Sequence, residues 1–295
     1  MSLMHRCRRF LFPPVAALAF TLAACAGLPS PEERNAGAEA LAAARGWHKV
    51  VLDTAPFKLA AFLPEPLPAG ELLTVYIEGD GFAWASSSEP SLDPTPVHPV
   101  GLQLALRHPG GHAVYLARPC QYAHAVSPDC DQAWWTARRF APEVIAASST
   151  ALDALKARTG AKRLVLVGYS GGAAVAALLA ARRGDVARLV TVAGNLDPRA
   201  WTAHHGLAPL AGSLDPVDEI ARLSAIAQIH FVGARDSVVP PALVRAFAAH
   251  FPLERRPEVR VVPGQDHQCC WAERWPELMS GAMPREAQRP GTSAP

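Results

Sequence analysis

Residues 163–180 read Arg-Leu-Val-Leu-Val-Gly-Tyr-Ser-Gly-Gly-Ala-Ala-Val-Ala-Ala-Leu-Leu-Ala, and this stretch decides the fold. Its apolar run at 164–167 predicts a parallel strand that is buried on both faces. The Ala- and Leu-rich residues from 173 onward predict a buried helix. A G-x-S-x-G turn between a strand and a helix is the context of a nucleophile elbow, in which Gly168 and Gly172 let the two elements close around Ser170.

The same turn also predicts a hydrogen-bond donor. The backbone N–H of Gly171 falls at the start of the predicted helix, where positive partial charge can stabilise a developing oxyanion. The alternative is an accidental match, because a chain with 21 glycines can contain G-x-S-x-G by chance. The flanking strand and helix favour the functional interpretation, which requires a base, an acid and a second oxyanion donor elsewhere in the chain.

The N-terminus predicts export and a lipid anchor. A basic segment with arginines at 6, 8 and 9 precedes an apolar run at 10–24, as in secretory signal peptides. A membrane-spanning helix needs about 20 apolar residues, and this run is shorter and contains Pro13-Pro14. The run ends in Leu-Ala-Ala-Cys25, which resembles the lipobox of bacterial lipoproteins. We therefore expect residues 1–24 to be removed as a lipoprotein signal peptide and Cys25 to carry lipid. An ordinary secretory signal that is cut nearby is the alternative.

This resemblance also implies a location and a set of partners. Ala26 rather than Asp follows Cys25, which in similar lipoproteins favours the outer membrane of a Gram-negative cell, with the domain facing the periplasm. The formal charge of +2 includes the arginines of the leader, so the mature chain is close to neutral. Basicity gives no argument for a nucleic-acid partner. We expect a small-molecule substrate, and a membrane that is reached through the N-terminal lipid.

Four cysteines fall in the predicted domain: Cys120, Cys130, Cys269 and Cys270. An exported protein occupies an oxidising compartment, where disulfides form. Cys120 and Cys130 would close a short loop and are the preferred pair. Cys269 and Cys270 are adjacent, and they could join each other, stay reduced or take one partner each from the first pair. The spacing does not choose among the three full pairings, and it does not look like a zinc site.

The remainder of the chain predicts one α/β domain at 47–280. A chain of 295 residues that is 50% hydrophobic and 18% charged is globular and can bury a substantial core. A tether with room for a short surface helix is expected at 25–46, and a disordered, Pro- and Gly-rich tail at 281–295. Other expected strands lie at 49–53, 57–63, 72–77, 113–117, 189–192, 228–232 and 259–262, and other expected helices at 101–107, 142–158 and 241–250. The long connection at 193–226 predicts a lid-like insertion.

The loop after the strand at 72–77 is rich in glycine and reads Glu78-Gly79-Asp80-Gly81. Glycine lets a backbone approach a substrate closely. Asp80 and Gly81 are therefore the best positions for the second oxyanion N–H. An ordinary glycine-rich turn is the alternative.

Two residues match the need for an acid and a base. Asp236 follows the strand at 228–232, and His267 follows the strand at 259–262. Both fall at the carboxyl ends of predicted parallel strands, as Ser170 does, so the three side chains can converge above one edge of the sheet.

Four other residues compete for these roles and fit less well. His204 and His205 lie within the long connection and are more typical of a lid or a surface. Asp197 follows the strand at 189–192 by a few residues and is an alternative acid. Asp266 adjoins His267 and is expected to shape the loop.

Taken together, the elbow, the segment at 233–240 and the segment at 264–267 resemble an α/β-hydrolase fold serine hydrolase, over roughly residues 47–280. The resemblance implies a central, mostly parallel sheet flanked by helices. It also implies Ser170 as nucleophile, Asp236 as acid and His267 as base in the cleavage of a carboxylic ester or a related acyl bond, with no metal or organic cofactor. Glu78 departs from the family pattern, in which a histidine is usual. An acyltransferase or peptidase with the same triad, or a non-catalytic, membrane-tethered envelope protein on the same fold, is the alternative.

Overall fold

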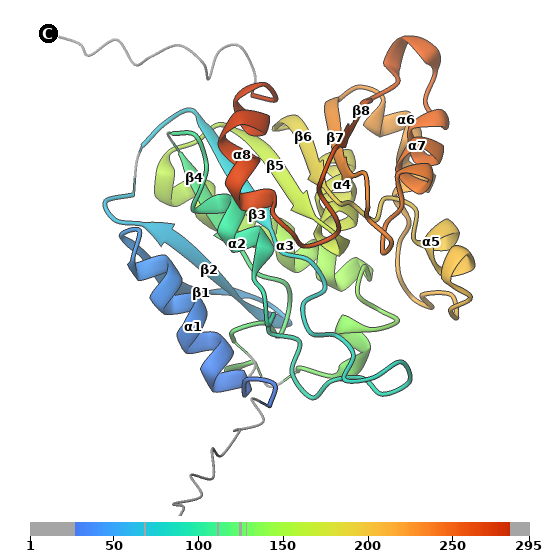
Figure 1. Cartoon of the computed structure of the whole chain (residues 1–295). Helices are drawn as coiled ribbons and strands as arrows, with labels where there is room; N and C mark the ends of the chain where they lie inside the picture. Colours follow the sequence, from blue (N-terminus) through green and yellow to red (C-terminus); the bar gives the residue numbers. More distant parts are fainter. Residues whose placement is uncertain (1–26, 68, 111, 124–125, 128, 284–295) are drawn as a thin grey trace, which may run out of the picture.

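In the computed structural model, eight strands form one sheet in the order β1-β2-β4-β3-β5-β6-β7-β8 (Figure 1). The structure describes residues 27–67, 69–110, 112–123, 126–127 and 129–283. The predicted signal peptide, Cys25 and residues 284–295 of the predicted tail lie outside these ranges. The strands are β1 (Trp47–Thr54), β2 (Phe57–Pro64), β3 (Leu72–Ile77), β4 (Ala113–Leu116), β5 (Arg163–Tyr169), β6 (Val186–Val192), β7 (Ala227–Gly233) and β8 (Glu258–Val262).

The sheet is mixed at one edge and parallel over the rest of its width. β1 pairs antiparallel with β2, and β2 pairs antiparallel with β4. From β4 to β8 every neighbouring pair is parallel. The parallel strands therefore bring their carboxyl ends to the same edge of the sheet, as the sequence analysis requires for a shared site.

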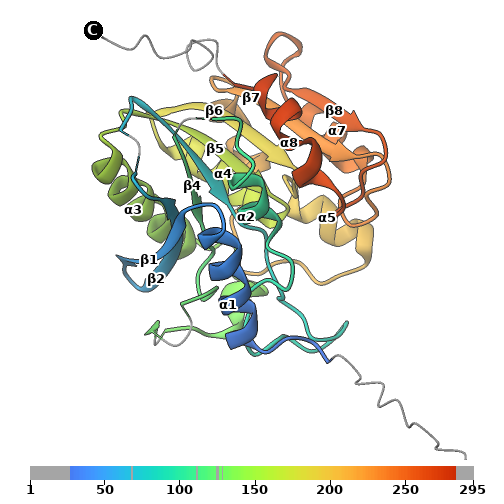
Figure 2. The same ribbon diagram turned by 60° about the vertical axis from the view of Figure 1, so that its left-hand side comes forward.

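Helices cover both faces of the sheet (Figures 1 and 2). Helices α1, α2 and α8 contribute to the core on one face, and α3, α4 and α7 to the core on the other. The helices are α1 (Pro31–Ala43), α2 (Val100–Ala105), α3 (Pro142–Thr159), α4 (Gly171–Arg182), α5 (Pro198–His205), α6 (Ile220–Leu223), α7 (Pro241–Ala249) and α8 (Trp271–Ser280), with short 3₁₀ turns at η2 (Gln132–Trp135), η3 (Pro216–Glu219) and η4 (Leu253–Arg255).

The central strands are buried on both faces, as their unbroken apolar runs predict. In β5, Leu164 and Leu166 pack into the core that contains α3 and α4, whereas Val165 and Val167 pack into the opposite core. This alternation is the period of two that a strand imposes on its side chains. The strand order puts β5, and therefore the elbow that follows it, in the interior of the sheet.

Helix α1 belongs to the packed domain. Pro31 is its first residue, and Ser30 and Glu33 form a capping box in which each side chain accepts the backbone N–H of the other residue. Ala38 and Ala42 are buried against the sheet. Helix α1 therefore lies within the segment predicted as a tether with room for a short surface helix, and it packs against the domain.

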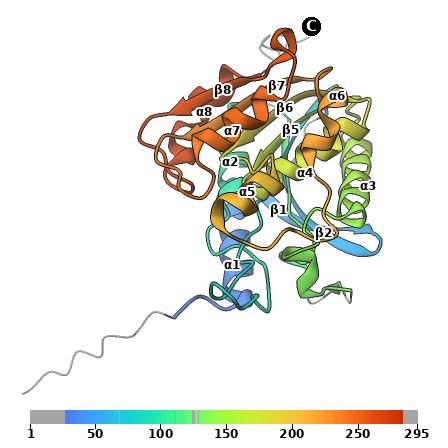
Figure 3. The same ribbon diagram turned by 90° about the vertical axis from the view of Figure 1, so that its right-hand side faces the viewer.

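The connection between β6 and β7 contains α5, η3 and α6. Figure 3 shows it running from α5 to α6 along the outside of the domain. Its middle is fastened to the segment before α3, because Leu214 donates its backbone N–H to the Phe140 carbonyl and Ser213 Oγ accepts the Phe140 N–H. Across the described part of the chain, no helix combines the length and apolar character that crossing a membrane requires.

Candidate active site

Ser170 occupies the turn between β5 and α4 in a strained backbone conformation. Its φ is +50° and its ψ −120°, in a region that residues other than glycine rarely adopt. The turn is tight on both sides: a Cβ on Gly172 would lie 2.3 Å from the Glu78 carbonyl oxygen, and one on Gly168 would lie 2.5 Å from Ala173 Cα. The two glycines are therefore required sterically, as the motif predicts.

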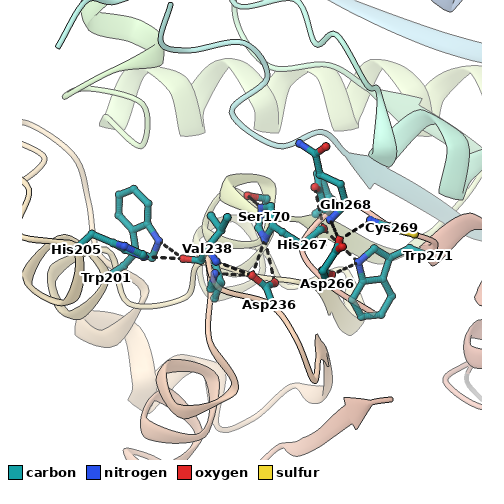
Figure 4. Close-up of polar contacts among 12 residues, drawn as sticks. Ser170, Trp201, His205, Asp236, Val238, Asp266, His267, Gln268, Cys269 and Trp271 are labelled. Atoms are coloured by element: carbon teal, nitrogen blue, oxygen red, sulfur yellow. Dashed lines mark hydrogen bonds and ion pairs between the residues drawn. The ribbon is translucent and has the colours of Figure 1, made fainter. Parts of the chain in front are cut away.

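The structure brings Ser170, His267 and Asp236 together (Figure 4). His267 Nε2 lies 3.0 Å from Ser170 Oγ, and His267 Nδ1 lies 2.9 Å from Asp236 Oδ2. Asp236 is 4% exposed. Both distances are within hydrogen-bond range, so the three side chains form a continuous chain from a buried carboxylate to a hydroxyl.

The acid loop orients the Asp236 carboxylate. Asp236 Oδ1 accepts the backbone N–H of Val238 at 2.9 Å and of Val239 at 2.7 Å. Oδ2 is the closer oxygen to His267 Nδ1, at 2.9 Å, and Oδ1 lies 3.2 Å from the same nitrogen. Helix α5 contacts the same loop, because Trp201 Nε1 donates to the Val238 carbonyl at 2.7 Å and His205 Nε2 lies 2.8 Å from it (Figure 4).

The base loop is fixed from two sides. The His267 carbonyl accepts the Tyr169 hydroxyl at 3.1 Å and the Trp271 indole N–H at 3.2 Å. Asp266 Oδ1 accepts the backbone N–H groups of Gln268 and Cys269, and these hydrogen bonds lower the pKa of the Asp266 carboxyl. Asp266 thus shapes the loop, as expected, and does not contact His267 Nδ1.

The glycine-rich loop after β3 is held by Glu78, which is 1% exposed. Its carboxylate accepts the backbone N–H groups of Gly79, Gly101 and Leu102 and the Tyr115 hydroxyl. Burial raises the pKa of the Glu78 carboxyl, and the four donors oppose that shift. Glu78 therefore joins the loop to the start of α2 and to β4, at the position where the family pattern has a histidine.

Of the residues predicted to supply oxyanion donors, Gly171 and Asp80 lie next to each other at the elbow. Gly171 is the first residue of α4, where its N–H has no intrahelical acceptor. A Cβ on Gly171 would lie 2.1 Å from Asp80 Oδ1, so the loop after β3 passes directly over the elbow. Gly81 has a φ of +68° and packs against the Pro94 carbonyl. Of the two loop positions, Asp80 is the one in contact with the elbow.

Asp80 carries a carboxylate that two buried arginines share. Its Oδ2 accepts Arg139 Nη1 at 2.6 Å, and its Oδ1 accepts Arg118 Nη1 at 3.3 Å. The guanidiniums are 6% and 5% exposed. Sequence reasoning missed this cluster, because the three residues lie on separate loops and nothing in their local patterns links them.

A cavity of about 360 Å³ opens onto Ser170 and His267. Asp80, Arg139 and Asn195 are among its polar lining residues. Its apolar lining consists mainly of aromatic and branched side chains, including Phe82, Trp84, Val97, Trp201, Val238 and Val239. The lid-like connection therefore contributes Asn195 and Trp201 to the wall. Among the described residues, no group of three or more His, Cys, Asp or Glu side chains is placed to hold a metal ion.

The other candidates lie apart from the triad. Asp197 caps helix α5 by accepting the Ala200 N–H at 2.8 Å. His204 and His205 are exposed on the same helix.

The disulfide predicted between Cys120 and Cys130 is confirmed, and Cys269 is joined to Cys270. The adjacent pairing is one of the alternatives that the sequence left open.

The sequence matches no protein-family model and no curated protein. Its structure, in contrast, resembles many solved structures. Est1E from Butyrivibrio proteoclasticus has a TM-score of 0.57 and 15% identity, over 82% of this chain and 99% of that one. An α/β serine hydrolase without a lid from Xanthomonas campestris has a TM-score of 0.51 and 17% identity, over 84% and 97%. The Pyrococcus furiosus esterase Pf2001 has a TM-score of 0.53 and 14% identity, over 86% and 94%.

These identities are low, so the likeness concerns the fold. Each comparison covers nearly the whole length of the other protein. The chain therefore has the α/β-hydrolase fold, with a mostly parallel sheet flanked by helices.

Proposed function

We propose that this protein is a serine hydrolase that cleaves carboxylic esters through an acyl-enzyme. The observation that carries the proposal is the unbroken chain from Asp236 through His267 to Ser170, with distances of 2.9 Å and 3.0 Å. A neutral serine is a weak nucleophile, and a base in hydrogen-bond contact, oriented by an acid, is what activates it. The similarity to proteins described as serine hydrolases and esterases supports the same class of reaction.

In the proposed mechanism, His267 Nε2 accepts the proton of Ser170 as Oγ attacks the ester carbonyl. Asp236 holds the imidazole with Nδ1–H toward the carboxylate and stabilises the imidazolium that forms. The backbone N–H groups of Gly171 and Asp80 stabilise the oxyanion. His267 then donates its proton to the leaving alcohol, and water releases the acyl group by the reverse sequence.

The strained backbone of Ser170 supports this assignment. A φ of +50° costs free energy of about 1–3 kcal/mol in a residue with a side chain. Such strain is typical of nucleophiles at this turn, where it exposes Oγ above the sheet. A protein that had lost turnover would gain stability by relaxing it, so the conformation favours an enzyme over the non-catalytic alternative.

A fluorophosphonate probe tests the proposal, because it labels only an activated serine. We expect the probe to label the wild-type protein at Ser170 and to leave Ser170→Ala unlabelled. Ser237 is an exposed serine next to Asp236 in the chain, and Ser237→Ala should be labelled as strongly as the wild type. Hydrolysis of p-nitrophenyl butyrate should fall by about 10⁴- to 10⁶-fold in Ser170→Ala. Near-wild-type hydrolysis by that variant would show that the site is elsewhere. Thioester and amide substrates, and alcohols as acyl acceptors, separate an esterase from a peptidase or an acyltransferase.

We also propose that Cys25 is lipidated and holds the domain at the periplasmic face of an outer membrane. The Leu-Ala-Ala-Cys motif at the end of the apolar run supports this proposal. Two or more acyl chains anchor a protein stably, whereas one binds only marginally. Cys25→Ser should release the protein into the soluble fraction or leave it uncleaved, and should not change the activity of the purified domain. Mass spectrometry that finds an unmodified N-terminus near residue 25 would make this an ordinary secreted protein.

A further inference from the structure

The cavity beside Ser170 contains a guanidinium whose donors are only partly used. Arg139 lines the cavity and is 5% exposed. Its Nε donates to the Thr136 carbonyl at 2.7 Å, and its Nη1 donates to Asp80 Oδ2 at 2.6 Å. A guanidinium has five N–H donors. Within the described residues the remaining ones, including both on Nη2, have no acceptor.

The charge around Arg139 is also unbalanced. The Asp80 carboxylate is shared with Arg118, so one anion faces two cations. Glu78 also lines the cavity, but its oxygens are occupied by four other donors and its pKa is raised by burial. Buried cations that lack counter-charge are unfavourable. An anion in the cavity would relieve this cost.

Asn195 supplies a second unpartnered polar group in the same cavity. It is 5% exposed, and its Oδ1 is buried without a hydrogen-bond partner among the described residues. This oxygen is an acceptor, so it can bind an O–H or N–H donor of a ligand but not an anionic oxygen. Its backbone N–H donates to the Ser170 carbonyl at 3.0 Å, which fixes it next to the elbow. A buried polar group without a partner needs an explanation, and a bound ligand is one.

Much of the remaining wall is apolar, so the ligand should have an apolar part as well. The Trp201 ring centroid lies 5.9 Å from Arg139 Cζ, and Phe82 and Val239 line the same space. A purely ionic ligand would leave these apolar side chains in contact with water. An ester with a hydrocarbon segment and an acidic end fits both parts.

We propose that the cavity selects esters whose acyl or alcohol part carries an anionic oxygen group, a carboxylate or a phosphate, and that Arg139 binds this group. The proposal rests on the proposed esterase function, because the cavity is the one that opens onto Ser170. Arg139 is thus a specificity-determining residue, and Asp80 and Arg118 position it.

Matched esters test the selectivity. The mono-p-nitrophenyl ester of adipic acid carries a carboxylate, and p-nitrophenyl hexanoate has the same chain length without it. After correction for spontaneous hydrolysis, we expect kcat/KM to be at least about tenfold higher for the anionic ester. A wild-type protein that hydrolyses the neutral ester equally well or better would overturn the proposal.

Variants then test the residue. Arg139→Gln should bring the ratio of the two kcat/KM values to about one, and Arg139→Lys should retain part of the preference because it keeps the charge. Arg138→Gln is the matched control, since Arg138 is adjacent but pairs with Glu143 at 2.7 Å on a half-exposed surface. An undiminished preference in a folded Arg139→Gln would overturn the role of Arg139. If Arg139→Gln does not fold, Arg139→Lys carries the test: a reduced preference supports the role of Arg139, and a preference as large as in the wild type would overturn it.

Binding without turnover separates this proposal from the proposed function. Isothermal titration calorimetry on Ser170→Ala measures this binding. Adipate is compared with the neutral adipamide, and glycerol 3-phosphate with the neutral glycerol, so the two pairs distinguish a carboxylate site from a phosphate site. We expect one of the two anions to bind and its neutral analogue not to, with binding lost in Ser170→Ala/Arg139→Gln. If no ester is hydrolysed but this pattern holds, the anion site stands and the esterase proposal fails. If neither anion binds, the anion site is wrong, whatever the esterase activity.

Discussion

Replacing Asp236 with Asn should disable the site and leave the fold in place, and the structure fixes the reason. Asp236 Oδ1 accepts two backbone N–H groups, from Val238 at 2.9 Å and from Val239 at 2.7 Å. An amide NH₂ at that position would face two donors. The asparagine oxygen must therefore take the Oδ1 position, and its NH₂ must take the Oδ2 position, which lies 2.9 Å from His267 Nδ1.

The closer partner of Nδ1 is then a donor, which favours the wrong tautomer of the base, against the oxygen at the Oδ1 position, which lies 3.2 Å from Nδ1. An NH₂ that donates to Nδ1 requires Nδ1 to be unprotonated, so the proton of the neutral imidazole moves to Nε2. Nε2 lies 3.0 Å from Ser170 Oγ, and a protonated Nε2 cannot accept the hydroxyl proton. We expect kcat to fall by about 10⁴-fold, which corresponds to about 5.4 kcal/mol of transition-state stabilisation.

The assay is p-nitrophenyl butyrate hydrolysis, with thermal unfolding followed by circular dichroism. Asp236→Asn should melt close to wild type because both N–H groups keep an acceptor, whereas Asp236→Ala should melt lower. Asp197→Asn is the matched control, since Asp197 caps α5 and does not touch His267. If Asp236→Asn retains a tenth or more of the wild-type kcat, or Asp197→Asn proves the crippling change, the reasoning about the acid is wrong.

Three further predictions concern stability. Burial lowers the pKa of His230 to about 3, so between pH 6.5 and 3 only the unfolded chain takes up this proton. The free energy of unfolding should therefore fall by about 1.4 kcal/mol for each pH unit from 6.5 toward 3. The urea midpoint of His230→Gln should depend less on pH than that of the wild type. Glu78→Ala leaves three backbone N–H groups and a hydroxyl without an acceptor and should lower the free energy of unfolding by about 3 kcal/mol or more; a loss below about 1 kcal/mol in urea titrations would contradict this. Cys130→Ser removes the disulfide to Cys120 and should lower the free energy of unfolding by about 2–4 kcal/mol. A reducing agent should then shift the urea midpoint of this variant less than it shifts the midpoint of the wild type.

Much of this architecture follows from local sequence patterns. The apolar run before Gly168 is buried on both faces of the sheet, and the Ala-rich run after Ser170 forms α4. Because parallel strands end at one edge, the positions of Asp236 and His267 after their strands were sufficient to predict that they meet Ser170. Chain order and strand ends carry that information without any long-range contact being known.

Other parts have no local signal. Helix α8 was not predicted, because it is short and contains Pro276, which interrupts a helical pattern. Its buried Trp271 nevertheless supports the base loop. The meeting of Asp80 with Arg118 and Arg139 depends on how three loops pack, and hydropathy periods do not encode such packing.

The contacts of α5 also bear on what the connection at 193–226 does. A movable lid should be fastened loosely, with few contacts to the groups that react. Here Trp201 Nε1 donates to the Val238 carbonyl, and His205 Nε2 lies within hydrogen-bond distance of that carbonyl. The backbone N–H of Val238 in turn donates to the Asp236 carboxylate. Displacing α5 would break two hydrogen bonds to the residue that orients the acid. At α5 the connection is therefore fastened to the acid loop, and the Trp201 indole both lines the cavity and holds the residue that orients Asp236.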